Sequence, residues 1–374
     1  MQCRCRTLQL GHGASLHSIR WLTLRTTWAS TLVDYDTPLP AGKLPGNLLG
    51  EMLRRYVTND PDVIVGPGIG RDAAAIAFGD EALVVKTDPI TFTTPDAGRY
   101  LVNVNANDIA CMGAVPRWLL VTALLPEHST TPRLVEEIFA SLSRAASELG
   151  ISLVGGHTEI TIGVDRPLLV GQMLGHAPRG SLLVPGNVRP GDAIILTGGI
   201  AVEGTAILAS SLGDSHPSLP HELLVRARAL AERPGISVLP ALRAMNAANV
   251  HPLYLHDPTE GGLATALHEL AAACGCGLLV QRGAVPVLDE TTAICKELDL
   301  DPLGLIASGA LLAVVRAGEI DTAISALQAE HIVAAHIGDI REQGAGSRMV
   351  VNGEDVELPS FPVDEIARYF SSTA

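Results

Sequence analysis

The chain has 374 residues, of which 47% are hydrophobic and 18% charged, a composition that fits a globular protein with more than one domain. Its formal net charge of −14 argues against nucleic-acid and membrane partners, because proteins that bind either one present basic faces to phosphate. An acidic protein can still bind ATP, since Mg²⁺ screens the phosphates and backbone N–H groups hold them.

Residues 1–38 differ in composition from the rest of the chain. Four arginines and no acidic residue occur in the first 33 positions, as in a transit-like leader, but a clean apolar region and a strong amphipathic period are both missing. We interpret this segment as a disordered extension or leader. The six cysteines form no CxxC pair, and Cys111 and Cys295 lie in apolar helical patterns typical of core residues. We expect a cytoplasmic protein.

Hydrophobic periodicity predicts alternating helices and strands. In the first half, the expected elements are a helix over 48–57, strands over 74–78 and 82–86, a helix over 96–111, a strand over 118–124, a helix over 132–149, and strands over 151–154 and 168–174. Thr131-Pro132 supplies a cap and a first-turn proline for the clearest of these helices, and Gly150 ends it.

Proline and glycine accumulate over 175–191, which we interpret as a linker. Beyond it we expect strands over 193–197, 252–256, 310–315 and 332–337, with a helix over 263–273. Because the elements alternate without a strict βαβ repeat, we predict an α+β fold. We expect an N-terminal domain over 39–178, a C-terminal domain over 186–355 and a tail over 356–374.

Two short strings in the first half have the residues of a phosphate site. In the first, Gly66, Gly68 and Gly70 precede Asp72, so that backbone N–H groups approach an anion beside a carboxylate. In the second, Asp88 closes Lys86-Thr87-Asp88 at the end of an apolar strand. Taken alone, the first string is equally compatible with a tight loop between strands, and the second is better explained by capping or turn formation.

Three further strings combine polar residues with helix or strand ends. Arg99, Asn103 and Asn107 share one helix face, which Asp108 adjoins, within an apolar segment. Gly155-Gly156-His157 follows a predicted strand. His256-Asp257-Pro258-Thr259-Glu260-Gly261-Gly262 lies between a strand and a helix that Thr259 is expected to cap. The joint pattern, carboxylates at strand ends beside glycine turns in both halves, favours a cleft for nucleotide phosphates and Mg²⁺.

These motifs also occur in a known order. GPGIGRDAA, KTDPITF, NANDIACMGAVPRW, GGHTEIT, EGTA, HDPTEGGLATALHELA and LDPLGLIASGALL resemble the motifs of the AIR synthetase-like (PurM-like) superfamily, and most of all its HypE-like, AIR synthase-related group. The resemblance runs from about Lys43 to about Gly338. It implies a two-domain α+β fold that dimerises through its N-terminal domains and binds ATP in a cleft between the domains.

The resemblance also implies roles for individual residues. The implied Mg²⁺ ligands are Asp72, Asp88, Asp108 and Asp257. The implied nucleotide-binding residues are Gly66, Gly68, Gly70, Asp72, Lys86, Thr87, Asn107, Gly155 and Gly156. The segments expected to face the second substrate contain Gly199, Glu203, Gly204, Thr205, Thr259 and Glu260. The candidate catalytic residues are His157, Lys43 and Asp108.

Departures from the family pattern bear on the reaction. Arg71 stands where relatives often carry a second acid, and the sequence ends without the C-terminal cysteine that carbamoyl dehydration requires, so we do not expect that chemistry. We predict an enzyme that uses ATP and Mg²⁺ to phosphorylate or activate a small molecule. The alternatives are a thiamine-monophosphate kinase-like activity and a non-catalytic nucleotide-binding protein with a maturation-protein partner.

Overall fold

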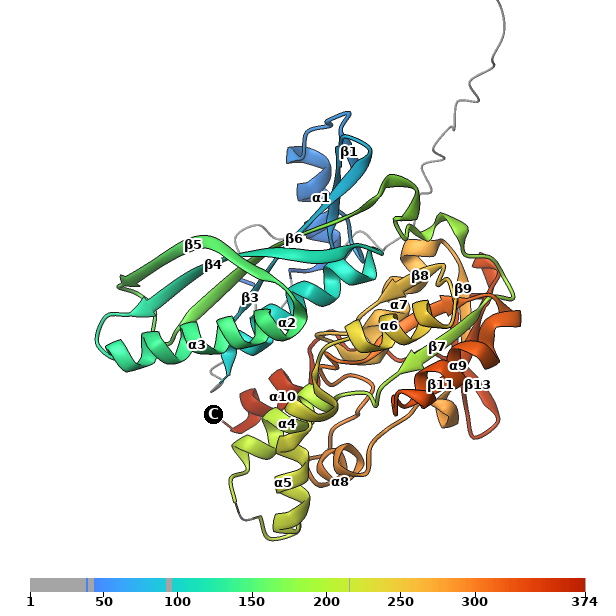
Figure 1. Cartoon of the computed structure of the whole chain (residues 1–374). Helices are drawn as coiled ribbons and strands as arrows, with labels where there is room; N and C mark the ends of the chain where they lie inside the picture. Colours follow the sequence, from blue (N-terminus) through green and yellow to red (C-terminus); the bar gives the residue numbers. More distant parts are fainter. Residues whose placement is uncertain (1–37, 40–43, 92–95, 215, 374) are drawn as a thin grey trace, which may run out of the picture.

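The computed structural model describes residues 38–39, 44–91, 96–214 and 216–373. The predictions for residues 1–37 and for Lys43 therefore lie outside the described residues. Two mixed sheets, each flanked by helices, make up the described part of the chain (Figure 1). This confirms the α+β prediction.

The first sheet has six strands in the spatial order β1-β2-β3-β6-β4-β5. The strands are β1 (Val63–Val65), β2 (Ala74–Phe78), β3 (Glu81–Ile90), β4 (Val115–Pro126), β5 (Ser152–Thr161) and β6 (Leu168–Pro178). All neighbours are antiparallel except β4 and β5, which are parallel. The helices of this half are α1 (Gly46–Tyr56), α2 (Ala97–Cys111) and α3 (Pro132–Leu149).

Helices α2 and α3 lie along one face of this sheet (Figure 1). The alternate strand residues that point toward them are buried, as for Val84 and Leu119. Gly98 brings the two helices together, because a Cβ at that position would lie 2.6 Å from the Ser141 hydroxyl oxygen. Thr131 caps α3 as predicted, since its hydroxyl accepts from the Leu134 N–H at 3.2 Å.

The second sheet has seven strands in the order β13-β12-β9-β11-β7-β10-β8. The strands are β7 (Ala193–Thr197), β8 (Tyr254–His256), β9 (Gly277–Gln281), β10 (Leu311–Val315), β11 (Ala334–Arg341), β12 (Ser347–Val351) and β13 (Glu354–Glu357). Only the β12–β9 pair is parallel. The helices are α4 (Val202–Ser211), α5 (His221–Ala229), α6 (Leu239–Ala247), α7 (Gly262–Cys274), α8 (Asp289–Glu297), α9 (Ile320–Ala329) and α10 (Glu365–Thr373).

The inner strand β7 is buried on both faces. Ala193 and Ile195 pack in the same apolar cluster as α6 and α9, whereas Ile194 and Leu196 pack in the cluster that contains α7. The first of these clusters also contains α2 and the first sheet, so a continuous core joins the two halves. No helix in the described ranges is long and apolar enough to cross a membrane.

Two local predictions were wrong. The glycines after residue 154 do not form a turn, because β5 continues through them to Thr161. Gly156 permits this: its φ is 142°, and a Cβ there would collide with the carbonyl oxygen of Val121 on β4. The N-cap of α7 is Gly261 rather than Thr259, and the Asp364 carboxylate accepts from the Gly261 N–H at 2.6 Å.

Candidate functional site

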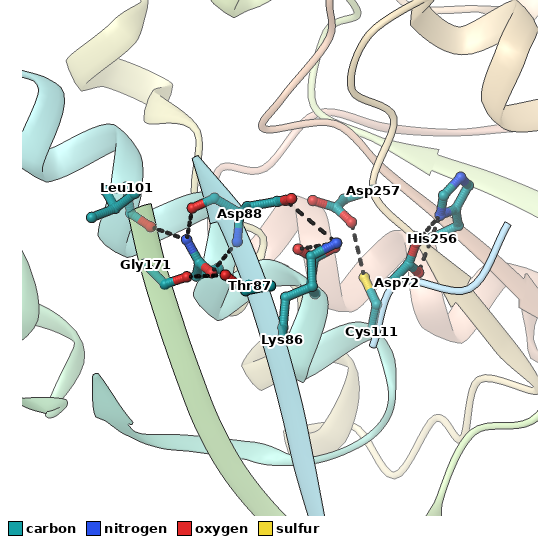
Figure 2. A network of polar contacts seen from close by, with 11 residues as sticks. Asp72, Lys86, Thr87, Asp88, Leu101, Cys111, Gly171, His256 and Asp257 are labelled. Carbon is teal, nitrogen blue, oxygen red and sulfur yellow. Dashed lines mark hydrogen bonds and ion pairs between the residues drawn. The ribbon is translucent and has the colours of Figure 1, made fainter. Parts of the chain in front are cut away.

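A lysine and two carboxylates lie where β3 passes α2. The Lys86 ammonium is 3.1 Å from Asp108 Oδ2 on α2 and 3.4 Å from Asp88 Oδ2 on β3 (Figure 2). Residues 86 and 88 share one face of the strand because side chains alternate. Burial alone would lower the pKa of Lys86, but the charges of Asp108 and Asp88 outweigh it and raise that pKa. The lysine is therefore a fixed positive charge.

Asn105 positions β3 beside these groups, a role that the sequence analysis missed. Its Oδ1 accepts from the Asp88 N–H at 3.0 Å, and its Nδ2 donates to the Leu101 carbonyl at 2.9 Å. The neighbouring Thr87 hydroxyl donates to the Gly171 carbonyl at 2.8 Å. A Cβ on Gly171 would lie 2.6 Å from the Asn105 amide nitrogen, so a glycine there leaves room for the asparagine.

A second group joins the two sheets. His256 on β8 places Nδ1 2.9 Å from Asp72 Oδ1 and Nε2 2.9 Å from Glu269 Oε2 on α7. Burial would lower the pKa of His256, but these two carboxylates raise it well above its ordinary value. The His256 imidazolium, which contacts a carboxylate through each of its two ring nitrogens, thus fixes the orientation of the Asp72 carboxylate.

Asp257, which follows β8, completes the arrangement. It is 2% exposed, its Oδ1 lies 3.7 Å from the Cys111 Sγ, and its Oδ2 has no hydrogen-bond partner among the described residues. Burial, with the nearby Asp72 charge, raises the pKa of Asp257 to about 7. The pKa of Asp108 is also raised, by burial and by Asp257. Several carboxylates are therefore concentrated around the buried Oδ2 of Asp257.

The donor set fits a divalent cation. Asp72, Asp88, Asp108 and Asp257 offer the carboxylate oxygens that Mg²⁺ prefers, and an ion would relieve their mutual repulsion. The residues come from a loop before β2, from β3, from α2 and from the loop after β8, so both halves of the chain contribute.

The family is decided by two matches. The model for the N-terminal domain of AIR synthase related proteins matches residues 70–177, and the model for their C-terminal domain matches residues 189–351. The chain belongs to the AIR synthase related family.

Individual relatives match most of the chain. A putative hydrogenase expression/formation protein of Methanocaldococcus jannaschii is 31% identical over 296 residues, which are 76% of this chain and 84% of that protein. The carbamoyl dehydratase HypE of Rhodobacter capsulatus is 32% identical over 75% of this chain and 83% of its own. A solved hydrogenase maturation protein HypE in complex with ATP has a TM-score of 0.62 and 25% identity, covering 87% of this chain and 97% of its own.

In this AIR synthase related chain the glycine loop, residues 66–70, lies against the second half of the chain. The Gly70 carbonyl accepts from the Tyr254 hydroxyl at 3.4 Å, and Gly70 itself has a φ of 69°, which favours glycine. Arg71 donates to the Gly66 carbonyl at 2.8 Å. A Cβ on Gly68 would lie 2.9 Å from the Arg71 side chain. The loop thus positions Asp72 next to His256.

Asn107 lies at the junction of the two halves rather than among the carboxylates. Its Nδ2 donates to the Ile236 carbonyl at 2.8 Å, and its Oδ1 accepts from the Val238 N–H at 3.0 Å. Asn103 bonds within its own helix, to the Arg99 carbonyl. The polar face expected on α2 is therefore buried, and Asn107 uses its amide to fix α2 against the second half. Its role in nucleotide binding stays a prediction.

The candidate catalytic residue His157 lies on β5, whose residues from 152 to 160 are all exposed. Its side chain is 67% exposed, and its ion-pair partner is Glu159 at 3.4 Å. Gly155 and Gly156 share this strand. Within the described part of one copy, no contact joins these three residues to the carboxylates, and their proposed roles stay predictions.

Most of the candidate substrate-binding residues around α4 have packing roles, and Glu203 is the exception. A Cβ on Gly204 would lie 2.5 Å from Leu305, and one on Gly199 would lie 2.7 Å from Leu288. The buried Thr205 hydroxyl contacts Thr291 Oγ1 at 2.8 Å. These three residues thus pack α4 against its neighbours. Thr259 and Glu260 lie in the loop between β8 and α7, where the Thr259 carbonyl accepts from the Ala307 N–H.

Glu203 differs from its neighbours on α4. It is buried, Ser308 hydrogen-bonds its carboxylate, and Oε2 has no partner among the described residues. Burial is the main cause that raises the pKa of Glu203 to about 7, and Glu260 and Asp364 add to it. A carboxyl of this kind exchanges protons near neutral pH.

The ionisation of Glu203 is expected to make the free energy of unfolding depend on pH. Because the folded pKa of Glu203 lies above its unfolded value of 4.5, its stabilising contribution is complete below pH 4.5 and is lost as the pH rises to about 7. The loss is on the order of a few kcal/mol. Glu203→Gln should flatten the fall in free energy of unfolding between pH 5 and 8, whereas Glu222→Gln, at an exposed position on α5, should not. Equal pH profiles for wild type and Glu203→Gln would contradict the expectation.

Proposed function

We propose that the chain is a Mg²⁺-dependent enzyme that transfers the terminal phosphoryl group of ATP to an oxygen of a small molecule, either as a stable product or as activation for a later displacement. The observation that carries this proposal is the convergence of Asp72, Asp88, Asp108 and Asp257 around Lys86, with the buried Oδ2 of Asp257 left without a partner among the described residues. The ATP complex of the related HypE supports the part of the proposal that concerns ATP binding.

The proposed roles follow from the contacts. Bound Mg²⁺ would neutralise phosphate charge and orient the triphosphate. Asp88 and Asp257 would hold the ion, and His256 would keep Asp72 in a fixed orientation toward it. Lys86, fixed between Asp88 and Asp108, would place a positive charge beside the phosphates. The chain's contribution is therefore positioning and charge, with no nucleophilic side chain required.

For the second substrate we propose the neighbourhood of Glu203. Its unpartnered Oε2 and its pKa of about 7 suit a carboxyl that accepts a proton from an attacking hydroxyl or donates a hydrogen bond to the substrate. Ser308 would orient the other carboxylate oxygen.

The direct test of the proposed function is ADP formation. Purified protein with ATP and Mg²⁺ is screened against small-molecule acceptors, thiamine monophosphate and carbamoyl compounds among them, and binding is measured in parallel by thermal shift. Acceptor-dependent ADP supports the enzyme. ATP binding with no ADP under any condition would instead favour the nucleotide-binding maturation partner, which the exposed Arg71 and the names of the hydrogenase-related relatives motivate.

We also propose that the chain forms a homodimer through β5. This edge strand is exposed along its length, with Leu153, Val154 and Ile160 40%, 53% and 58% exposed, and unprotected apolar edges are rare in monomers. His157 lies on the same strand, so a catalytic role for it requires the second copy.

A charged residue in this edge is expected to break the dimer. Val154→Asp combined with Ile160→Asp should halve the mass measured by light scattering, because the two carboxylates would be buried unpaired. Val225→Asp, at an exposed apolar position of α5, serves as the control and should leave the mass unchanged. A wild-type protein that is already monomeric would refute the dimer.

A further inference from the structure

Two buried polar groups lie close together at the junction of the two halves. Tyr100, in the first turn of α2, is 8% exposed and packs against Ile236 of the second half, and its hydroxyl hydrogen-bonds no described residue. Glu203, in the first turn of α4, is 6% exposed, and its Oε2 has no partner within the described ranges. A buried polar group without a partner is costly unless a ligand or a water satisfies it.

The packing around these residues brings them to the same place. Residues 235–236, against which Tyr100 packs, and residues 202–203 meet at Gly309. A Cβ at that glycine would lie 2.6 Å from a carbonyl oxygen of the first segment and 3.3 Å from a side chain of the second. Burial raises the pKa of Tyr100, and the nearby charge of Glu203 raises it further. The hydroxyl and the carboxylate therefore flank one space without bonding to each other.

The charged side chains beside Glu203 are themselves acidic. Ser308 hydrogen-bonds the Glu203 carboxylate. Burial raises the pKa of Glu203, and the charges of Glu260 and Asp364 add to this effect. Asp364 is held in place by the backbone, because its carboxylate accepts from three N–H groups at 2.6, 2.8 and 3.3 Å. A ligand in this space therefore meets excess negative charge on one side and a tyrosine on the other.

We propose that the space between Tyr100 and Glu203 binds a cationic nitrogen of the second substrate, an ammonium or amidinium group. The Glu203 carboxylate would pair with the positive charge, and Tyr100 would contribute its hydroxyl and a cation–π contact. The inference rests on the proposed function, which assigns the neighbourhood of Glu203 to the second substrate. It requires Glu203 to be ionised in the complex, the form that also accepts a proton.

The position of Tyr100 on α2 limits the size of this substrate. Tyr100 and Asp108 are eight residues apart on the same helix, which separates their Cα atoms by about 12 Å. Asp108 belongs to the carboxylates proposed to hold Mg²⁺ and the phosphates. Because the phosphates and the substrate together span that distance, we expect a small compound whose acceptor oxygen is a few bonds away from its nitrogen, such as an amino alcohol.

Matched pairs of small probes test the charge preference. Ethanolamine and choline are titrated into the full chain without nucleotide, and binding is followed by saturation-transfer NMR. Their uncharged analogues are ethylene glycol and the alcohol in which a tert-butyl group replaces the trimethylammonium group of choline. We expect each cation to bind about tenfold or more tightly than its analogue, because only the cation forms a charge-assisted contact with the carboxylate.

Substitutions assign this preference to the two residues. Glu203→Gln keeps the shape and removes the charge, so it should give each cation and its analogue similar affinities. Tyr100→Leu should reduce the preference for choline over its analogue by about threefold or more. The matched controls are Glu222→Gln, at an exposed position of α5, and Tyr56→Leu, at an exposed position of α1, and both should keep the wild-type preference.

Each result supports or overturns the inference. A wild type that binds neither cation, or that binds the uncharged analogues equally well, overturns it, as does an unchanged preference in folded Glu203→Gln. Should Glu203→Gln unfold, an unchanged preference in Tyr100→Leu is the contradicting result. ADP formation with ATP and Mg²⁺ is measured separately. Cation binding without ADP contradicts the proposed enzyme alone, whereas ADP formed with an uncharged acceptor and no cation binding contradicts this inference alone.

Discussion

Asp257→Asn is expected to lower ATP turnover by about 100-fold or more while leaving the ligand-free protein at least as stable as the wild type. The physical reason is that this carboxylate is buried among like charges, with its pKa raised to about 7 and with no hydrogen-bond partner for Oδ2 in the described part of the chain. Asparagine keeps the shape and removes the charge. It therefore removes a ligand for Mg²⁺ without removing a contact that the fold needs.

The measurement pairs ADP formation with thermal unfolding at pH 8, where the wild-type carboxylate is ionised. Asp321→Asn, an exposed position in the first turn of α9, is the control and should change neither quantity. Near-normal turnover in Asp257→Asn, with the protein folded, would remove Asp257 from the site. Asp88→Asn is expected to act in the same direction.

Lys86→Met should produce the largest loss of stability among single substitutions at the site. Lys86 is the cation that contacts the buried Asp108, and removing one partner of a buried ion pair costs about 3–5 kcal/mol. The partner Asp88 is more exposed, at 38% of its side chain, and is expected to contribute less. Added Mg²⁺ should restore part of the lost stability, because it supplies positive charge to the same carboxylates.

A double-mutant cycle separates charge balance from function. Lys86→Met combined with Asp108→Asn should recover most of the free energy of unfolding but none of the turnover. Lys296→Met, at an exposed position of α8, is the control and should leave the free energy of unfolding unchanged. If Lys86→Met alone unfolds with the same midpoint denaturant concentration as the wild type, the ion pair does not contribute the stability that we assign to it.

Local patterns in the sequence were sufficient for most regular elements. The strands over 74–78 and 193–197 agree with β2 and β7 to the residue, and the cap and terminal glycine of α3 were read correctly. These features depend on neighbouring residues: alternation, a capping hydroxyl, a first-turn proline and a glycine in the left-handed region. The course of β5 was missed because pairing with β4, rather than its own residues, keeps Gly155-Gly156 extended.

The sequence by itself determined the chemical type of the candidate metal ligands. All four carboxylates, Asp72, Asp88, Asp108 and Asp257, were predicted from their motifs. Only the tertiary structure decided which groups meet. His256 contacts a carboxylate 184 residues away, and Cys111 contacts one 146 residues away. Such contacts follow from how two sheets pack through α2, which local periodicity does not encode. For the same reason, a cysteine in an apolar pattern was assigned to the core alone, and its carboxylate neighbours appear only once both halves are folded together.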